Sequence, residues 1–360
     1  MSNILFVFDN DKGNRGGLRI IDATYEGIDC VGKSKIIYSL KTRYSVLNFA
    51  LFLGYGVLSY ARRNRISRVD ILYLHSSNLI DLALALLLKM ITFNSIRVIV
   101  PFYHLAKEAA EFKVSKSIVS YWERDKLRLL FMPLIADIAL TENSYIKIYL
   151  ERIGVNKVVV STPGVKTSLL DLDIESMTGR LRDIDLLFVG ALCKEKGIFD
   201  FVEVIKALKT KGIRLKAAIC GYRQTDADWE LLISRSSEIS DLLEIYPDAD
   251  ESAKVELLQR ARVVVFPSYL EGVPIVFWEA MSQGCLIITY RLNSYVDVES
   301  NIISCELGSV QSLTDTVLVV LSDYKSYVNR YVYHNRRDAS LNTFEGEISK
   351  IANLLCSMAG

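Results

Sequence analysis

Two glutamates, Glu271 and Glu279, stand with seven residues between them in the stretch VVVFPSYLEGVPIVFWEAMSQG. A carboxylate only accepts hydrogen bonds, and a vicinal diol offers it two donors. Gly272 and Val273 lie between the glutamates at the start of a predicted helix, where free N–H groups and the helix dipole suit a phosphate. The pattern favours a nucleotide sugar, with the diphosphate on these two amides and one glutamate each for the sugar and the ribose. The spacing alone fits equally well a helix with one solvated glutamate beside an acidic loop.

The elements that must position these residues form a strand, a loop, a helix and a second strand. Val263–Phe266 is a β-branched apolar run with the length of a buried strand. Pro274 stands where the first residue of a helix would stand, and Gly284 stops that helix just after Gln283. Leu286–Thr289 is the next predicted strand.

The same stretch resembles the E-x7-E signature of family 4 glycosyltransferases, which are retaining enzymes of GT-B fold. The matching residues are Pro267, Ser268, Glu271, Gly272, Pro274, Glu279, Ala280, Met281 and Gly284. The resemblance implies that Glu271 contacts the transferred sugar as a catalytic group and that Glu279 binds the ribose hydroxyls. We place Gly272, Val273 and Pro274 at the diphosphate of the donor.

A second match lies in DLLFVGALCKEKGIFDF, where the family has a V-G-R-L-x-x-x-K-G pattern. Gly190, Lys196 and Gly197 match, and the resemblance implies that Lys196 neutralises the diphosphate. Ala191 stands where the family has an arginine, so another cation must replace it or the site is weakened. Lys194, in the same loop, is our first candidate for that cation, although two lysines also suit an ordinary solvated loop.

Further donor contacts are predicted at other loops. Gly221 ends a strand and permits close backbone approach, and Arg223 follows it as a second candidate cation. Arg15, in the glycine-rich loop after the first strand, is the third candidate. The loop PDADESAKVELL has Asp248 where the family has the glycine of its nucleobase loop.

The first half of the chain supplies two further candidates. Gly16 and Gly17 match a glycine pair that lies beside the donor phosphate in the family, although alone they describe an ordinary turn. His104 follows the strand RVIVP, and the family places a histidine there, near the transferred sugar. A lone histidine beside aromatic residues is otherwise more often structural. His75 also ends a strand and is the weaker candidate.

Strand-like runs alternate with helical patterns along the chain, which is typical of α/β folds with parallel sheets. We predict a GT-B fold in which two doubly wound Rossmann-like domains face each other across a cleft. Residues 1–165 form the acceptor-side domain, 166–183 the linker and 184–335 the nucleotide-sugar domain, and 336–360 form a C-terminal helix that packs back on the first domain. The expected strands are 4–8, 35–40, 70–75, 97–101, 137–140, 157–161, 185–189, 215–220, 243–246, 263–266, 286–289 and 302–305.

Composition narrows the class of protein. Of 360 residues, 51% are hydrophobic and 24% are charged, which predicts full cores and excludes disorder. We recognise no secretory signal, and no apolar run reaches the ~18 residues that a membrane-spanning helix needs. The six cysteines form no CxxC motif, so we expect reduced core thiols in a cytoplasmic protein.

Charge is divided unevenly between the halves. Residues 1–165 carry 22 basic and 14 acidic residues, or +8, which favours an anionic partner on that half. Ser45–Tyr60 is almost wholly apolar and leads into an arginine-rich run, and Ile118–Ile135 mixes aromatic residues with cations. We therefore expect peripheral binding to the inner face of the cytoplasmic membrane, although both segments also suit domain helices with solvated faces.

These patterns together predict a metal-independent glycosyltransferase without a cofactor. It would move a sugar from a UDP- or GDP-sugar to a glycan or lipid-linked acceptor with retention, in bacterial surface polysaccharide biosynthesis. The first alternative is a catalytically inactive GT-B protein that binds sugar nucleotides or a partner enzyme, as Ala191 suggests. The second is another GT-B enzyme, such as an epimerase or phosphorylase. No nucleic-acid-binding module is recognisable.

Overall fold

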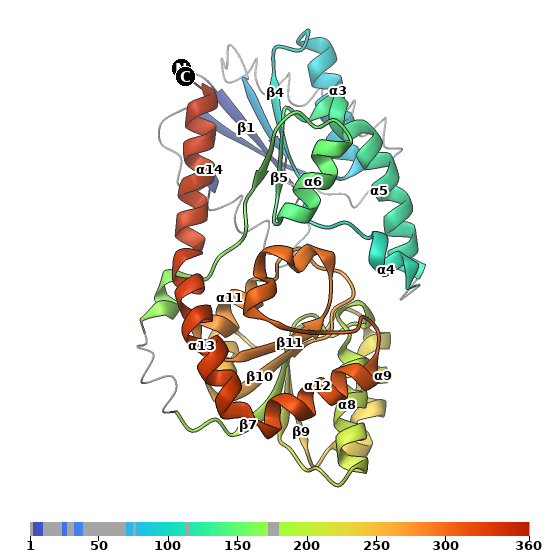
Figure 1. Ribbon diagram of the computed structural model, residues 1–360. Helices are drawn as coiled ribbons and strands as arrows, with labels where there is room; N and C mark the ends of the chain where they lie inside the picture. The colour runs from blue at the N-terminus through green and yellow to red at the C-terminus, as the bar shows by residue number, and fades with distance from the viewer. Residues whose placement is uncertain are drawn as a thin grey trace. The chain divides into compact units, whose positions relative to one another are not determined.

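The computed structural model describes residues 3–9, 24–26, 32–38, 70–74, 77–112, 116–171 and 180–359 (Figure 1). The chain divides into two compact units. The first unit comprises Met1–His104, Ser120–Pro163 and Phe344–Gly360, and the second comprises Leu105–Val119 and Gly164–Thr343. Five of the sequence-derived candidates, Arg15, Gly16, Gly17, Ser45–Tyr60 and His75, lie outside the described residues.

The first unit contains a six-stranded parallel sheet with the order β2-β1-β3-β4-β5-β6. Its strands are β1 (Asn3–Asp9), β2 (Gly32–Tyr38), β3 (Ile71–Leu74), β4 (Arg97–Pro101), β5 (Ile138–Thr141) and β6 (Val158–Val160). Its helices are α3 (Leu79–Ile91), α6 (Ser144–Arg152), α14 (Phe344–Ala359) and all but the first turn of α5 (Lys116–Ile135). Ile351 and Leu355 of α14 are buried in one cluster with Phe6 and Tyr73 of the sheet, so the C-terminal helix belongs to this core.

The second unit contains the other six-stranded parallel sheet, with the order β12-β11-β10-β7-β8-β9. Its strands are β7 (Ile184–Val189), β8 (Ala217–Gly221), β9 (Leu243–Pro247), β10 (Ala261–Phe266), β11 (Leu286–Tyr290) and β12 (Ile303–Cys305). Its α-helices are α4 (Lys107–Glu111), α8 (Ile198–Thr210), α9 (Asp226–Ser236), α10 (Glu251–Arg260), α11 (Ile275–Ser282), α12 (Val310–Ser322) and α13 (Tyr324–Leu341). Short 3-10 turns are η1 (Thr167–Leu170), η2 (Lys194–Lys196), η3 (Ser237–Ile239) and η4 (Asn293–Asn301).

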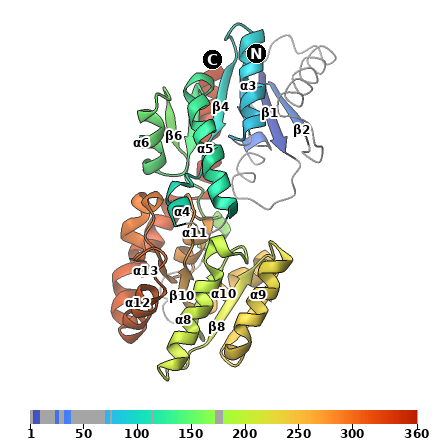
Figure 2. The same cartoon turned by 90° about the vertical axis from the view of Figure 1, so that its right-hand side faces the viewer.

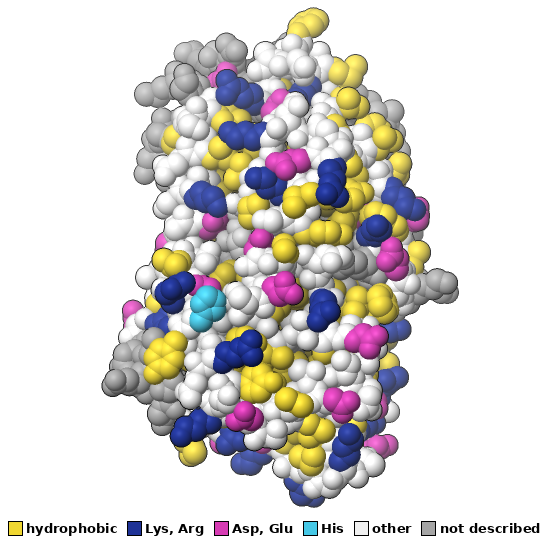
Figure 3. Space-filling model, viewed as in Figure 1, with side chains coloured by type: hydrophobic (Ala, Val, Ile, Leu, Met, Phe, Trp, Pro, Cys, Tyr) yellow, Lys and Arg dark blue, Asp and Glu magenta, His cyan; other side chains and the backbone are white. Residues whose placement is uncertain are grey.

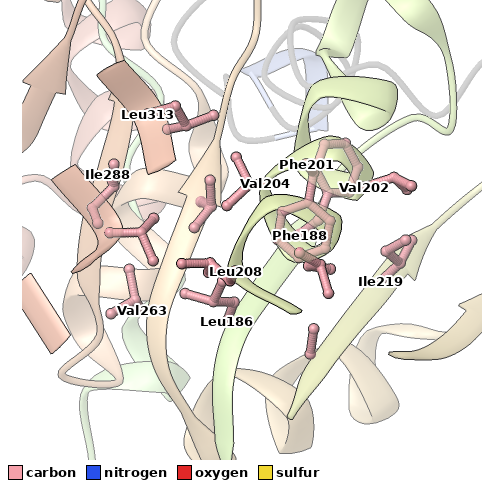
Figure 4. Packing of buried hydrophobic residues seen from close by; sticks show 14 of the residues in the cluster. Leu186, Phe188, Phe201, Val202, Val204, Leu208, Ile219, Val263, Ile288 and Leu313 are labelled. Carbon is pink, nitrogen blue, oxygen red and sulfur yellow. The ribbon is translucent and has the colours of Figure 1, made fainter. Parts of the chain in front are cut away.

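Apolar side chains fill both faces of the second sheet. Leu186, Phe188 and Val263 belong to a cluster with Phe201 of α8 on one face (Figure 4). The neighbouring residues of the same strands, such as Leu187, pack into a separate cluster with α11 on the other face. Strands buried on both faces explain why the sequence shows continuous apolar runs here instead of alternation.

The predicted α/β class and all twelve predicted strands are confirmed, with boundaries that shift by a few residues. The described part of the predicted linker, 166–171 and 180–183, lies within the second unit. Arg182 there is buried and donates to the carbonyl of Gln283 at 2.6 Å. The two units part again between Thr343 and Phe344, instead of at the predicted residue 336.

Cys193, Cys220, Cys285 and Cys305 are buried and free, as predicted. Cys356 is disulfide-bonded, so the prediction of a reduced thiol is wrong there. Among the described helices, none has the length and apolar character needed to cross a membrane.

Candidate donor site

Two glycines bring the ends of β7 and β8 into direct contact. The two strands are parallel neighbours, so their carboxyl ends lie at the same edge of the sheet, where ligands of open α/β sheets bind. The amide of Gly190 donates to the carbonyl of Cys220 at 3.0 Å, and a Cβ at Gly221 would lie 1.7 Å from the Gly190 carbonyl oxygen. Only glycine therefore fits at Gly221.

The loop after β7 is fixed by a third glycine, Gly197. Lys194–Lys196 form η2, and Gly197 caps it with φ +72° before α8 begins. A Cβ at Gly197 would lie 1.9 Å from the carbonyl oxygen of Pro267, which directly precedes the loop of Glu271. The contact holds the lysine loop and the glutamate loop together at the backbone.

Glu271 is buried and ion-paired. Its Oε1 accepts hydrogen bonds from Lys196 Nζ and, at 2.8 Å, from Ser268 Oγ. Burial lowers the pKa of the Lys196 ammonium, but the carboxylate of Glu271 more than offsets this and raises it above its usual value. Lys196 therefore stays a cation. The structure brings together these two residues, which lie 75 positions apart in the sequence.

A tyrosine pair that the sequence did not reveal anchors the same loop. The amide of Tyr269 donates to the Glu195 carbonyl at 3.0 Å, and its hydroxyl donates to Asp200 Oδ2 at 2.6 Å. Tyr290 at the end of β11 donates to the same oxygen at 2.7 Å. Burial and the neighbouring carboxylate raise the pKa of both phenols. Both therefore remain protonated donors, which ties the loop before Glu271 and the end of β11 to Asp200 of α8.

Glu279 has a lysine partner too. Lys254 of α10 donates to Glu279 Oε1 at 2.6 Å, and the glutamate is only 4% exposed. The other oxygen, Oε2, is buried and has no hydrogen-bond partner. A carboxylate oxygen without a donor in such a place is costly, and a ligand hydroxyl would satisfy it. Our sequence reasoning missed Lys254 as a partner of Glu279, although it lies within the stretch PDADESAKVELL that we took as the nucleobase loop, most of which forms α10.

Arg223 is engaged by two side chains. Its Nε donates to Asp248 Oδ2 at 2.6 Å, and its guanidinium lies over the Trp229 ring at 5.6 Å. The amide and the guanidinium of Arg223 lower the pKa of Asp248 below its usual value. Asp248 itself has φ +55°, a conformation that favours glycine and that aspartate tolerates better than most residues. Asp248 therefore stands in a backbone conformation that suits glycine, and its carboxylate also binds Arg223.

Lys194 differs from the other two described cations. It is exposed, and no ion pair within the described part of the chain involves it, whereas Lys196 and Arg223 each bind a carboxylate. Ala191, at the position of the missing arginine, is 3% exposed. Lys194 is thus the described candidate whose charge is not already balanced by a neighbouring acid.

The helix behind the motif begins one residue later than predicted. Pro274 is the N-cap, with φ −65° and ψ 134°, and Ile275 is the first helical residue of α11. Gly272 and Val273 are buried just before it. Gln283 is the C-cap and Gly284 has φ +74°, which confirms the predicted stop.

His104 lies in the first unit, three positions after the end of β4, and is half-buried. The next residue, Leu105, begins the segment that belongs to the second unit, where Ala109 of α4 packs in a small cluster with Tyr269 and Leu270. In the ranges that the structure describes, no group of three or more His, Cys, Asp or Glu side chains is placed to hold a metal ion.

Solved structures show which fold these two sheets form. The chain superposes on HepE from Anabaena, solved in a complex with UDP and glucose, with a TM-score of 0.72 and 12% sequence identity. The superposition covers 99% of this chain and 100% of that chain. It also superposes on sucrose-phosphate synthase from Thermosynechococcus elongatus, with a TM-score of 0.73 and 14% identity, covering 99% of each chain. Together with the two parallel sheets, these likenesses show that the protein has the predicted α/β GT-B fold.

Sequence comparison points to one class of protein for the second unit. Residues 175–337 match the sequence model of the family described as glycosyl transferases group 1. Glycogen synthase from Mycobacterium tuberculosis is 28% identical over 142 residues, which is 39% of this chain and 34% of that protein. CapM, a capsular polysaccharide biosynthesis glycosyltransferase from Staphylococcus aureus, is 22% identical over 169 residues, 45% of this chain and 42% of that protein. The chain thus spans well under half the length of these relatives.

Proposed function

We propose that the protein is a glycosyltransferase that takes a sugar from a nucleotide-diphosphate sugar. The observation that carries the proposal is the pair of buried glutamates in the second unit, each held by a lysine. Glu271 pairs with Lys196, and Glu279 pairs with Lys254 while keeping one buried oxygen without a donor. The match to glycosyl transferases group 1 covers the same part of the chain.

Each residue has a chemical role in this proposal. Glu279 would accept hydrogen bonds from the ribose hydroxyls, and Glu271 would bind the transferred sugar. Lys196, Lys194 and the N–H groups at the start of α11 would stabilise the negative charge that develops on the leaving diphosphate. These cations and dipoles would do the work of a metal ion, so we propose a metal-independent reaction.

The family 4 resemblance supports retention of the anomeric configuration. The leaving phosphate would take the proton of the acceptor hydroxyl on the same face, so the glycosidic bond to the acceptor forms as the bond to phosphate breaks. No protein base is required, and His104 would act near the transferred sugar.

The acceptor is proposed to be a glycan or a lipid-linked glycan in bacterial surface polysaccharide synthesis. The name of CapM, a capsular polysaccharide glycosyltransferase, supports this setting. The HepE complex with UDP makes UDP the first nucleotide to test. A lipid-linked acceptor would place the enzyme on the inner face of the cytoplasmic membrane.

A thermal-shift panel of UDP, GDP, ADP and their sugars tests the proposal. A ligand at 100 times its dissociation constant should add about 2.7 kcal/mol of stability. The variant Glu279→Gln, which keeps the shape of the side chain, should lose about half or more of this stabilisation at the same ligand concentration. The absence of a shift with every nucleotide would exclude a donor site.

Ala191 supports a second candidate, an inactive protein that binds sugar nucleotides. The two candidates differ in catalysis, so donor hydrolysis or transfer should be measured with the nucleotide sugar that gives the largest shift. A shift without turnover over many hours would favour the inactive protein.

A further inference from the structure

One helix of the first unit, α5, presents apolar side chains to solvent along its C-terminal half. Leu127, Leu130, Phe131 and Leu134 of α5 follow the i, i+3, i+4, i+7 spacing of a single helix face. Their exposed fractions are 47%, 65%, 37% and 68%. Single exposed leucines are ordinary, but a contiguous apolar face usually marks an interaction surface.

The opposite face of α5 is firmly packed, so the exposed residues are held in place. Leu129, Met132 and Ile135 are at most 7% exposed. The helix therefore has two apolar faces, and the core accounts for only one of them. The name outer stripe is used below for Leu127, Leu130, Phe131 and Leu134.

The end of α3 adds two more exposed apolar side chains. Met90 is 69% exposed and Phe93 is 94% exposed. Phe93 has φ +50°, an unfavourable conformation for an aromatic residue, and it contributes almost nothing to the core in return. The strain is therefore unexplained by packing and is consistent with a role at the surface.

Topology brings these two sets of side chains to the same face of the first sheet. α3 connects β3 to β4, and α5 lies on the connection from β4 to β5, all within one parallel sheet. Right-handed crossovers of this kind put both helices on one face, and Figures 1 and 2 both show α3 beside α5. Figure 3 shows hydrophobic side chains along the edge where Figure 1 draws these helices.

Cations and aromatic rings border the outer stripe. Arg124 lies over the Tyr121 ring at 5.5 Å, and Lys126 lies over the Trp122 ring at 5.6 Å. Both cations are exposed, although Lys126 also pairs with Glu123 at 2.7 Å. Rings beside cations at the end of an apolar stripe match the layers of an anionic bilayer, in which headgroups lie above acyl chains.

We propose that the outer stripe, with Met90 and Phe93, is the surface by which this protein binds an anionic lipid bilayer. This inference rests on the proposed function only in that a lipid-linked acceptor would explain it. The charge beside the stripe favours a bilayer over a second copy of the chain, which would bring the same cations together. The apolar side chains would enter the interface while Arg124 and Lys126 contact anionic headgroups.

Vesicle co-sedimentation of the full chain at low salt tests the proposal. The vesicles contain either phosphatidylglycerol with phosphatidylethanolamine or phosphatidylcholine alone. The variant Leu130→Gln with Leu134→Gln should lower partitioning by at least about thirtyfold, since each leucine is two-thirds exposed and would be buried. Leu341→Gln is the matched control, because Leu341 is 74% exposed in the second unit, and it should partition like the wild type.

A second variant tests the charge. Arg124→Gln with Lys126→Gln should lower partitioning into anionic vesicles by about fivefold for each cation and leave neutral vesicles unaffected. Thermal unfolding and the UDP shift are measured on every variant. A retained UDP shift with lost vesicle binding separates this surface from the donor site.

Three results would overturn the inference. They are equal sedimentation with and without vesicles, equal partitioning of the leucine variant and the wild type, and a wild-type dimer that the leucine variant converts to a monomer. The last result, from light scattering without lipid, would assign the stripe to a second copy of the chain. If one of these results excludes the bilayer surface while UDP still raises the unfolding temperature of the protein, the proposed donor site stands.

Discussion

Removing the carboxylate of Glu279 should weaken nucleotide binding, whereas removing that of Glu271 should mainly lower turnover. Glu279 is 4% exposed, its Oε1 is bound by Lys254 at 2.6 Å, and its Oε2 is buried without a donor. A ribose hydroxyl on this oxygen would make a charge-assisted hydrogen bond worth about 1.5–3 kcal/mol. Glu279→Gln should therefore raise the dissociation constant of UDP or GDP by about ten- to a hundredfold.

Glu271 has a different environment. Both donors described above, Lys196 and Ser268, contact its Oε1. In our assignment it meets the sugar, which free nucleoside diphosphate lacks. Glu271→Gln should therefore change the affinity for free nucleotide by less than about threefold while lowering the transfer rate at least about tenfold.

Isothermal titration calorimetry with free nucleoside diphosphate separates the two roles. Glu123→Gln is the control, because Glu123 also accepts from a lysine, at 2.7 Å, but is exposed and lies in the first unit. Unfolding without ligand must show that each variant is folded, since Glu279→Gln removes the charge that pairs with Lys254. Equal losses of nucleotide affinity in the Glu271 and Glu279 variants would refute the assignment of ribose to one glutamate and sugar to the other.

Three further predictions follow from single contacts. Lys194→Ala should lower donor affinity about tenfold if this unpaired lysine replaces the missing arginine, and unchanged transfer kinetics would exclude it. Gly212→Ala should lower the free energy of unfolding by about 1–2 kcal/mol because of its φ of +77°, and Gly197→Ala should lower it by about 2–5 kcal/mol because its Cβ also meets a carbonyl oxygen. Equal losses of the two variants in urea unfolding would contradict the clash at Gly197. Arg260→Gln removes the ion pair with Asp183 and should lower the free energy of unfolding by about 0.2–1 kcal/mol at pH 7. Because Arg260 lowers the pKa of Asp183, this stability is present above the usual pKa of 3.8 and is lost at lower pH. In urea unfolding at a series of pH values, the stabilities of wild type and variant should therefore converge at low pH. A difference that stays constant with pH would count against the Arg260–Asp183 pair.

Much of the fold could be predicted from the sequence because its signals are local. Buried parallel strands require apolar runs, and all twelve runs that we identified became strands. The stop of α11 at Gly284 was predictable because glycine is the residue that most readily adopts a left-handed conformation, here with φ +74°, and so can be recognised from its type alone. The two glutamates were found for the same reason, since their spacing lies within one short stretch.

Tertiary structure alone decided the partners of those residues. Lys254 reaches Glu279 across 25 positions, and Tyr290 reaches Asp200 across 90. No local pattern encodes these pairs, because the order of the second sheet places β10 beside β7 and brings distant loops to one edge. The same holds for the exposed face of α5: the sequence shows leucines at helical spacing, but only packing decides which of them the core buries. The sequence thus determined the chemistry that is available, and the three-dimensional arrangement determined which charges are already balanced and which remain for a ligand.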